Sequence, residues 1–406
     1  MEGMPKISAE EIAPVEEEKS PELTKPFNLK FYVTDHNLDI DSGKSPEELR
    51  ELFADIKKDS ISSIRYDWRW NRIEPGQGAV ESETLTRYTE GIRLMTEAGL
   101  EAPTIVLSSV PGWAMDLYKK NKEEFFAAYR EYVEQVKNSL IQVSEETGVK
   151  ISRVQVLNEL NNSVYTPFSP DELPRFCAIT REVFQDYNPE IKLIGSFMAG
   201  NSSELTSKVK MGVPIEKYLA ENKELLAVFD TYAIDYYPGT WHVPITERLI
   251  TGKEIFAQMG LLETVMTEIA SWGKEYEIGE VGLPTNMTFL SAKHNEDRQR
   301  YFYQVFFRAF KKLLLDFQER GVALPTQVGL FEAMDEPPKN LKGKILRSVT
   351  PFPEHDFGMR RAGAGAGTRK EILRGNRNVA PEKRDETPSK LSELIEYINT
   401  PIRKRT

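Results

Sequence analysis

Two glutamates stand where short apolar stretches give way to polar residues. Glu159 follows the apolar run 154–157 within ISRVQVLNELNN, and Glu280 lies in YEIGEVGLPT, a second short apolar stretch. An ionised carboxylate at the mouth of a buried strand loses solvation, so this placement is costly. We therefore interpret Glu159 and Glu280 as a functional pair at the carboxyl ends of two strands of one barrel.

Two carboxyl groups on either side of an anomeric carbon can hydrolyse a glycosidic bond. One protonates the leaving oxygen and the other attacks carbon. They differ in protonation, because neighbouring carboxylates repel and the pKa of one rises. We expect Glu159 to be the acid/base and Glu280 the nucleophile, kept ionised by Arg65 and a tyrosine hydroxyl after the sixth strand. Asn158 is expected to hydrogen-bond the sugar 2-hydroxyl.

Further residues at predicted strand ends are candidates for contact with a sugar. Trp70, Trp113 and Trp241 suit stacking against a sugar face, because an indole presents flat apolar area beside a polar rim. Glu332, after the eighth strand, is a candidate substrate contact. A helix cap or an ion pair with an arginine is the alternative role for Glu332.

The elements that must position these residues alternate along the chain. Short apolar stretches predict strands near residues 27–33, 60–65, 102–107, 154–157, 192–197, 228–235, 276–280 and 327–331, with helices between them. Strands separated by helices form parallel sheets, and eight such units close into a single (β/α)8 barrel of the α/β class. The site of such a barrel lies at the carboxyl ends of its strands. No Gly-rich dinucleotide or phosphate-binding fingerprint follows a predicted strand.

Three segments fall outside this alternating pattern. Residues 1–26 are acidic, contain proline and lack periodicity, so we expect a disordered leader before a barrel spanning 27–400. Residues 338–389 show no strong periodicity and contain the run RAGAGAG, and we expect a long mobile loop over the barrel mouth. The basic tail 401–406 is expected to be disordered.

The composition limits the classes of partner. Lys and Arg number 53 against 63 Asp and Glu, a net charge of −10, which argues against nucleic-acid binding. The single cysteine, Cys177, excludes intrachain disulfides, and the four histidines are not paired at metal-ligand spacing, so we expect no metal or organic cofactor. No apolar run approaches about 18 residues, so no membrane span is expected. The N-terminus lacks the apolar core of a signal peptide, which predicts a cytoplasmic location unless a signal has been removed. The oligomeric state stays open.

The strand ends resemble those of clan A glycoside hydrolases, which are retaining (β/α)8 enzymes. Asn158-Glu159 and Glu280 carry this resemblance, which covers roughly residues 27–360. WNRIEPGQG at 70–78 resembles a turn of β-galactosidase-like and β-xylosidase-like families, IGEVGLP at 278–284 the nucleophile strand of β-1,3-glucanases, and FEAMDEP at 331–337 strand eight of β-1,3-glucanases and β-1,4-galactanases. The resemblance implies double displacement at β-linked oligo- or polysaccharides, with Tyr237 touching the nucleophile and Tyr236 as the fallback.

Several alternatives stay open at this point. Arg65 could instead form a structural ion pair with Asp67 or Glu332. A carbohydrate-binding barrel without catalysis is the main rival function, a transglycosylase would use the same residues, and an unrelated barrel lyase or isomerase is a further possibility. Leu283 and Phe331 stand where related motifs often have tryptophan, so the sugar, the linkage and endo versus exo action are not assigned.

Overall fold

A computed structural model describes residues 25–38, 42–199, 212–237, 252–283, 285, 296–335, 358–361, 367–370, 372–374 and 388–402. Eight parallel strands form a closed barrel in chain order, and the last strand pairs with the first. The strands are β1 (Lys30–Thr34), β2 (Ser63–Arg69), β3 (Thr104–Ser108), β4 (Arg153–Val156), β5 (Lys192–Ala199), β6 (Thr231–Tyr236), β7 (Glu275–Val281) and β8 (Gln327–Leu330). The predicted (β/α)8 barrel is confirmed.

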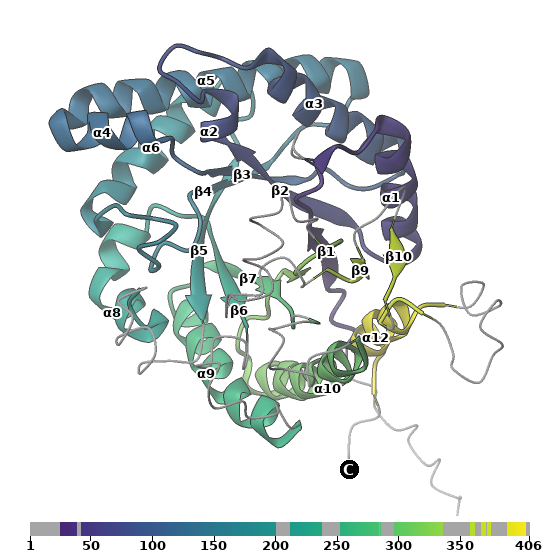
Figure 1. The fold of residues 1–406 in the computed structure, drawn as a ribbon. Coiled ribbons are helices and arrows are strands. Elements are labelled where there is room, and N and C mark those ends of the chain that lie inside the picture. Colours follow the sequence, from purple (N-terminus) through teal and green to yellow (C-terminus); the bar gives the residue numbers. More distant parts are fainter. Residues whose placement is uncertain are drawn as a thin grey trace, which may run out of the picture.

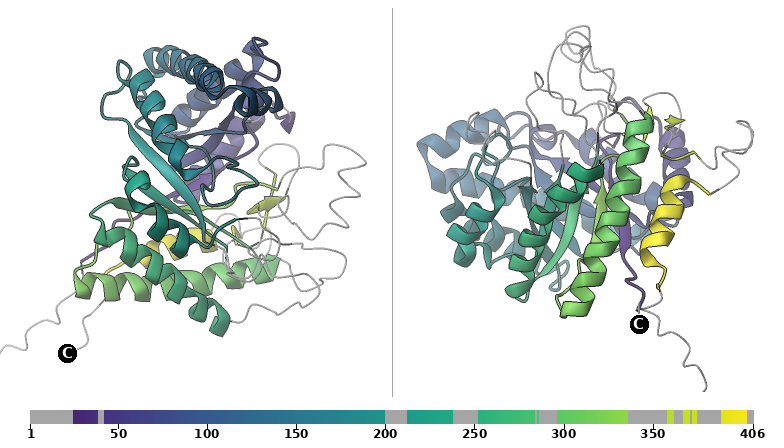
Figure 2. Two further views of the ribbon diagram at one scale, coloured as in Figure 1. Left: turned by 90° about the vertical axis from the view of Figure 1, so that its left-hand side faces the viewer. Right: turned by 90° about the horizontal axis from the view of Figure 1, so that it is seen from below.

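Helices surround the barrel (Figure 1) and pack alongside its strands in the side views (Figure 2). They are α1 (Pro46–Lys58), α2 (Trp70–Ile73), α3 (Ser82–Glu97), α4 (Gly112–Lys120), α5 (Lys122–Thr147), α6 (Leu173–Phe184), α8 (Ile215–Leu226), α9 (Gly252–Ser271), α10 (Glu296–Arg320) and α12 (Lys390–Asn399). The Asn399 side chain accepts a hydrogen bond from Leu29 N at 2.8 Å and donates one to Leu29 O at 3.1 Å. The last helix is thereby fastened to the residue just before β1.

β2 runs farther along the chain than the sequence predicted. The predicted strand ended at Arg65, whereas β2 continues to residue 69. Tyr66 and Trp68 pack outward against Tyr88 of α3, with ring centroids 6.2 and 5.3 Å away. Because alternate strand residues face opposite sides, Arg65 points into the barrel from the middle of β2. Arg65 therefore lies below the strand ends, and its guanidinium group reaches the pocket there because the arginine side chain is long.

Some short elements were not predicted, because two to nine residues carry little periodicity. These include α2, α4 and an antiparallel pair, β9 (Arg360–Arg361) with β10 (Thr368–Arg369). The pair belongs to the segment predicted to be a loop. Buried Arg360 donates to Asp55 Oδ2 at 2.9 Å and to Asp59 Oδ2 at 3.0 Å, so this part of the segment is bound to α1 and the residue that follows it.

Several predicted segments lie wholly or mainly outside the described residues: the leader up to residue 24, most of 338–389 including 362–366, and the tail from 403. The leader, the mobile loop and the tail therefore stay predictions. No helix in the described part of the chain combines the length and apolarity that crossing a bilayer requires.

Candidate active site

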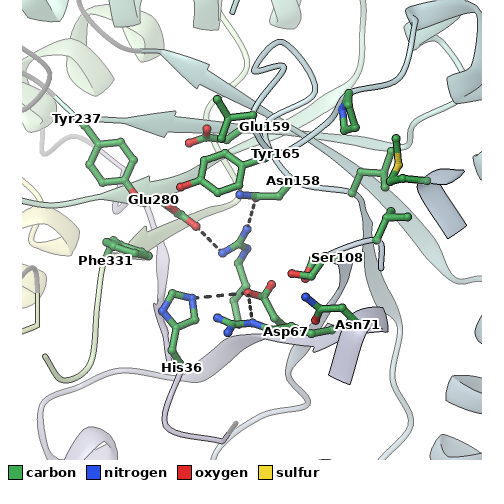
Figure 3. Close-up of a pocket in the computed structure, with 18 residues that line it drawn as sticks. His36, Asp67, Asn71, Ser108, Asn158, Glu159, Tyr165, Tyr237, Glu280 and Phe331 are labelled. Atoms are coloured by element: carbon green, nitrogen blue, oxygen red, sulfur yellow. Dashed lines mark hydrogen bonds and ion pairs between the residues drawn. The ribbon is translucent and has the colours of Figure 1, made fainter. Parts of the chain in front are cut away.

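A pocket of about 460 Å³ opens at the carboxyl ends of the strands (Figure 3). Pockets that bind small molecules have volumes of roughly 300–1,000 Å³. Seven strands contribute to the lining at or just beyond their ends, with His36, Arg69, Ser108, Glu159, Tyr237, Glu280 and Phe331. Both predicted catalytic glutamates therefore reach one pocket.

Glu280, near the end of β7, is 5% exposed and is bound on both carboxylate oxygens. Arg65 Nη1 donates to Oε1 at 2.5 Å, and the Tyr237 hydroxyl donates to Oε2. Burial, and then the negative charge of Glu280, raise the pKa of Tyr237 well above its ordinary value, so the phenol keeps its proton. Of the two tyrosines considered, Tyr237 is thus the one that contacts Glu280, whereas the hydroxyl of Tyr236 faces the sulfur of Met259.

The Arg65 guanidinium group connects several polar residues of the site through hydrogen bonds. Besides Glu280, it donates from Nε to Gln155 Oε1 at 2.8 Å and from Nη2 to Asn158 Oδ1 at 2.9 Å. Burial lowers the pKa of Arg65, but Glu280 and other acidic neighbours outweigh burial, so this pKa lies above its ordinary value. The sequence left open whether Arg65 serves the active site or forms a structural ion pair with Asp67 or Glu332. In the structure the ion pair of Arg65 is with Glu280, the nucleophile candidate.

Glu159 follows β4 on a turn with unusual backbone angles. Leu157 and Glu159 have φ of 64° and 46°, in the left-handed region that side chains rarely occupy. Glu159 N donates to Ser196 Oγ at 2.8 Å, and Asn162 Nδ2 donates to Glu159 Oε2 at 2.6 Å. These contacts fix both ends of Glu159 and direct its carboxyl group to the pocket.

Asn158, between these two residues, also lines the pocket. Its Oδ1 accepts hydrogen bonds from Arg65 at 2.9 Å, Gln155 at 3.0 Å and Ser196 at 3.2 Å. Because three donors converge on the oxygen, Nδ2 is the amide atom that can donate to a sugar hydroxyl. This geometry suits the predicted contact with a 2-hydroxyl.

Two of the three predicted tryptophan platforms do not line the pocket. Trp70 is 1% exposed, stacks on Tyr132 at 5.0 Å and does not line the pocket, so the prediction that it stacks on sugar is wrong. Packing between α2 and α5 removes it from the pocket. The Trp113 ring packs edge-on against Trp70, and its indole nitrogen donates a hydrogen bond to Glu74 O at 3.0 Å. Trp113 is likewise not among the residues that line the pocket. Trp241 lies outside the described residues.

Glu332 is also buried behind the pocket instead of lining it. It is 0% exposed, and its Oε2 lies 2.9 Å from His36 Nδ1. His36 does line the pocket, and its Nε2 lies 3.6 Å from Asp67 Oδ2. Direct substrate contact by Glu332 is therefore wrong in this structure, in which Glu332 lies behind His36, a residue that lines the pocket.

The sequence reasoning missed four residues that organise the site: Gln155, Ser196, Asn162 and Phe331. Gln155 and Ser196 are polar residues inside apolar strands, and both face Asn158. Phe331 lines the pocket and meets the Tyr237 ring edge-on at 5.7 Å. A polar side chain on the inward face of a barrel strand was the available signal for the first two.

No group of three His, Cys, Asp or Glu side chains among the described residues is arranged to hold a metal ion. The polar atoms at the pocket instead form a continuous hydrogen-bonded set around two carboxyl groups.

No protein-family model and no curated protein sequence matches the chain. Solved structures do. The exo-β-1,4-mannosidase Op5Man5 from Opitutaceae bacterium strain TAV5 is 12% identical at TM-score 0.59, with 91% of this chain and 59% of that protein covered. A family 39 glycoside hydrolase from Bacteroides cellulosilyticus WH2 is 16% identical at TM-score 0.50, with 85% and 61% covered.

A GH5_18 protein from Bifidobacterium longum subsp. longum, solved with Manb1-4GlcNAc, is 14% identical at TM-score 0.55, with 84% of this chain and 75% of that protein covered. The chain thus spans about three fifths of the length of the first two proteins. At these identities the likeness shows the fold alone, and the chain shares the (β/α)8 barrel fold of these solved glycoside hydrolases.

Proposed function

We propose that this protein is a retaining β-glycoside hydrolase. The observation that carries the proposal is the asymmetry of two glutamates on one pocket. Glu280 accepts hydrogen bonds from a cation and a phenol, which favour its ionised form, whereas Oε2 of Glu159 accepts a hydrogen bond from the neutral amide of Asn162. A nucleophile and a general acid require this difference.

In the first step, the Glu280 carboxylate attacks the anomeric carbon while Glu159 protonates the leaving oxygen. In the second step, ionised Glu159 takes a proton from water, and the oxygen of that water displaces Glu280 from the same carbon. Two displacements at one carbon restore the β configuration.

The surrounding residues support both steps. Arg65 and Tyr237 hold one oxygen of Glu280 each and so fix the direction of attack. Asn158, whose oxygen is fully engaged, can donate to the 2-hydroxyl, a contact that strengthens in the transition state. Since one similar solved structure is an exo-β-1,4-mannosidase and another binds Manb1-4GlcNAc, β-mannosides are the first substrates we would test.

The test is turnover of aryl β-mannoside, β-glucoside, β-galactoside and β-xyloside, with the anomer of the first product identified by NMR. We expect the β anomer first. Glu280→Ala should lose at least roughly 10³-fold in kcat/KM, and azide should rescue it to give an α-glycosyl azide. Azide should give the β-glycosyl azide with Glu159→Ala, because that variant keeps the nucleophile.

Glu275→Ala is the matched control, since Glu275 begins the same strand and its half-exposed side chain pairs with Lys192. It should turn over substrate like the wild type. An α product, or unchanged turnover in Glu280→Ala, would refute the retaining mechanism. Sugar binding without turnover in the wild type and both site variants would point to a carbohydrate-binding barrel.

A further inference from the structure

A third carboxyl group lies beside the proposed catalytic pair. Asp235, the last residue but one of β6, is 0% exposed and pairs in register with Glu280. A Cβ at Gly279 would lie 2.2 Å from Asp235 Oδ1, so the carboxyl group packs directly on the glycine that precedes Glu280. The backbone that carries the nucleophile candidate therefore rests against Asp235.

This carboxyl group is not held as an ion. Among the described residues, neither oxygen of Asp235 has a hydrogen-bond partner of ordinary geometry. A hydrogen bond from the Ser196 hydroxyl influences Asp235 less than burial does, and the same hydroxyl also lies within hydrogen-bond distance of Asn158 Oδ1, at 3.2 Å. The titratable groups that face Asp235 come from β1, β2, β7, the turn after β4 and the end of β6 itself: Tyr32, Arg65, Glu280, Glu159 and Tyr237.

The charges of these groups indicate which form Asp235 takes. Among the described residues, Arg65 is the cation with the largest effect on Asp235, and it is engaged by Glu280. With protonated Asp235 and protonated Glu159, the cluster sums to zero. It still sums to zero after the first step, when Glu280 is esterified and Glu159 is ionised. An ionised Asp235 would add an uncompensated buried negative charge in both states, which is costly.

We propose that Asp235 is a positioning residue that works as a neutral carboxylic acid. It fills the space over Gly279 and supports the strand end that carries Glu280, without competing with Glu280 for Arg65. Burial, and then the charge of Glu280, raise the pKa of Asp235 well above its ordinary value, in agreement with this role. The proposal predicts that a neutral side chain of the same shape can replace Asp235.

The experiment compares wild type, Asp235→Asn and Asp235→Ala. Asp235→Asn should keep kcat/KM within about tenfold, with both limbs of the pH–rate profile unmoved. Asp235→Ala should lose roughly a further tenfold in kcat, with KM little changed, because the carboxyl group that packs against Gly279 is removed. Infrared difference spectra of wild type against Asp235→Asn at neutral pH should show the carbonyl band of one protonated carboxylic acid in the wild type alone.

Other outcomes would overturn the proposal. If Asp235 is an anion, Asp235→Asn removes a negative charge beside both glutamates. Both limbs should then move to lower pH by about one unit or more, and no carboxylic acid band should be lost. A loss above roughly 10³-fold, or failure of Asp235→Asn to fold, also contradicts it, since a neutral isostere must be tolerated. The role rests on the proposed function, but the infrared measurement needs no turnover and can fail independently.

Discussion

Replacing Arg65 with methionine is the sharpest test of how the site is held together. The side chains of Arg65 and Glu280 are 4% and 6% exposed, so their ion pair is shielded from solvent. Removing one partner of a buried pair costs about 3–5 kcal/mol, because the other charge stays buried alone. Domains are stable by roughly 5–15 kcal/mol, so Arg65→Met should fold, and for a barrel of this size its Tm should be lower by roughly 5 °C.

The pH dependence of this loss has a definite sign. The penalty comes from an ionised Glu280 without its cation. As the pH falls the carboxyl group takes up a proton, and the penalty disappears. The Tm difference between wild type and Arg65→Met should therefore be largest at neutral pH and narrow toward acid pH. Thermal unfolding followed by circular dichroism at several pH values measures this difference directly.

Activity adds a second readout with a matched control. Loss of one preorganised donor at a reacting group costs about 10²–10³ in rate, and we expect at least this for Arg65→Met. Arg153 pairs with buried Glu277, and neither residue lines the pocket, so Arg153→Met should lower the Tm while keeping turnover within a few-fold. If Arg65→Met unfolds like the wild type at all pH values, or loses no more activity than Arg153→Met, the reasoning is refuted.

Three further predictions concern single side chains. Tyr237→Phe removes the hydrogen bond to Glu280 Oε2 and should lower kcat by roughly 10–100-fold with little change in Tm, which steady-state kinetics and calorimetry can check. Tyr165 lines the pocket six residues after Glu159 and is 44% exposed, so we expect it to contact the leaving group of a disaccharide. Tyr165→Ala should therefore raise KM for a disaccharide while leaving kcat for an aryl glycoside near the wild-type value. Unchanged KM for both substrates would argue against a leaving-group subsite at Tyr165. Trp70→Ala should cost about 3–5 kcal/mol in urea unfolding, because Trp70 is a core residue, and a selective rise in KM without loss of stability would restore its predicted role as a sugar platform.

The sequence was most informative where a side chain's chemistry coincided with a strand end. The barrel followed from eight apolar stretches separated by helices, and Glu159, Glu280 and Asn158 followed from polar residues that end such stretches. These predictions depend on local pattern alone. Once the barrel closes, the carboxyl ends of all its strands meet at one face.

The prediction was wrong where side-chain direction decided the outcome. Trp70 stands after a strand end, but α2 turns its ring into the aromatic cluster on α5, and no local pattern distinguishes this from a ring at the pocket. Asp235 and Gln155 were overlooked for the opposite reason, since each is a polar residue inside an apolar strand. Whether such a residue faces the barrel interior depends on register, which is set by pairing between strands far apart in sequence.

The turn that carries Asn158 shows why the polar residues inside the strands are needed. Leu157 and Glu159 both adopt positive φ without being glycine, and such conformations cost about 1–3 kcal/mol each. Gln155 of β4 donates to Leu157 O at 2.9 Å, and Ser196 of β5 accepts a hydrogen bond from Glu159 N at 2.8 Å. These two hydrogen bonds stabilise the strained turn. Each of these bonds contributes about 0.5–1.5 kcal/mol, and leaving a buried partner unsatisfied costs about 1–3 kcal/mol. Loss of either side chain should therefore destabilise the turn, and this links the placement of Glu159 to two residues that do not line the pocket.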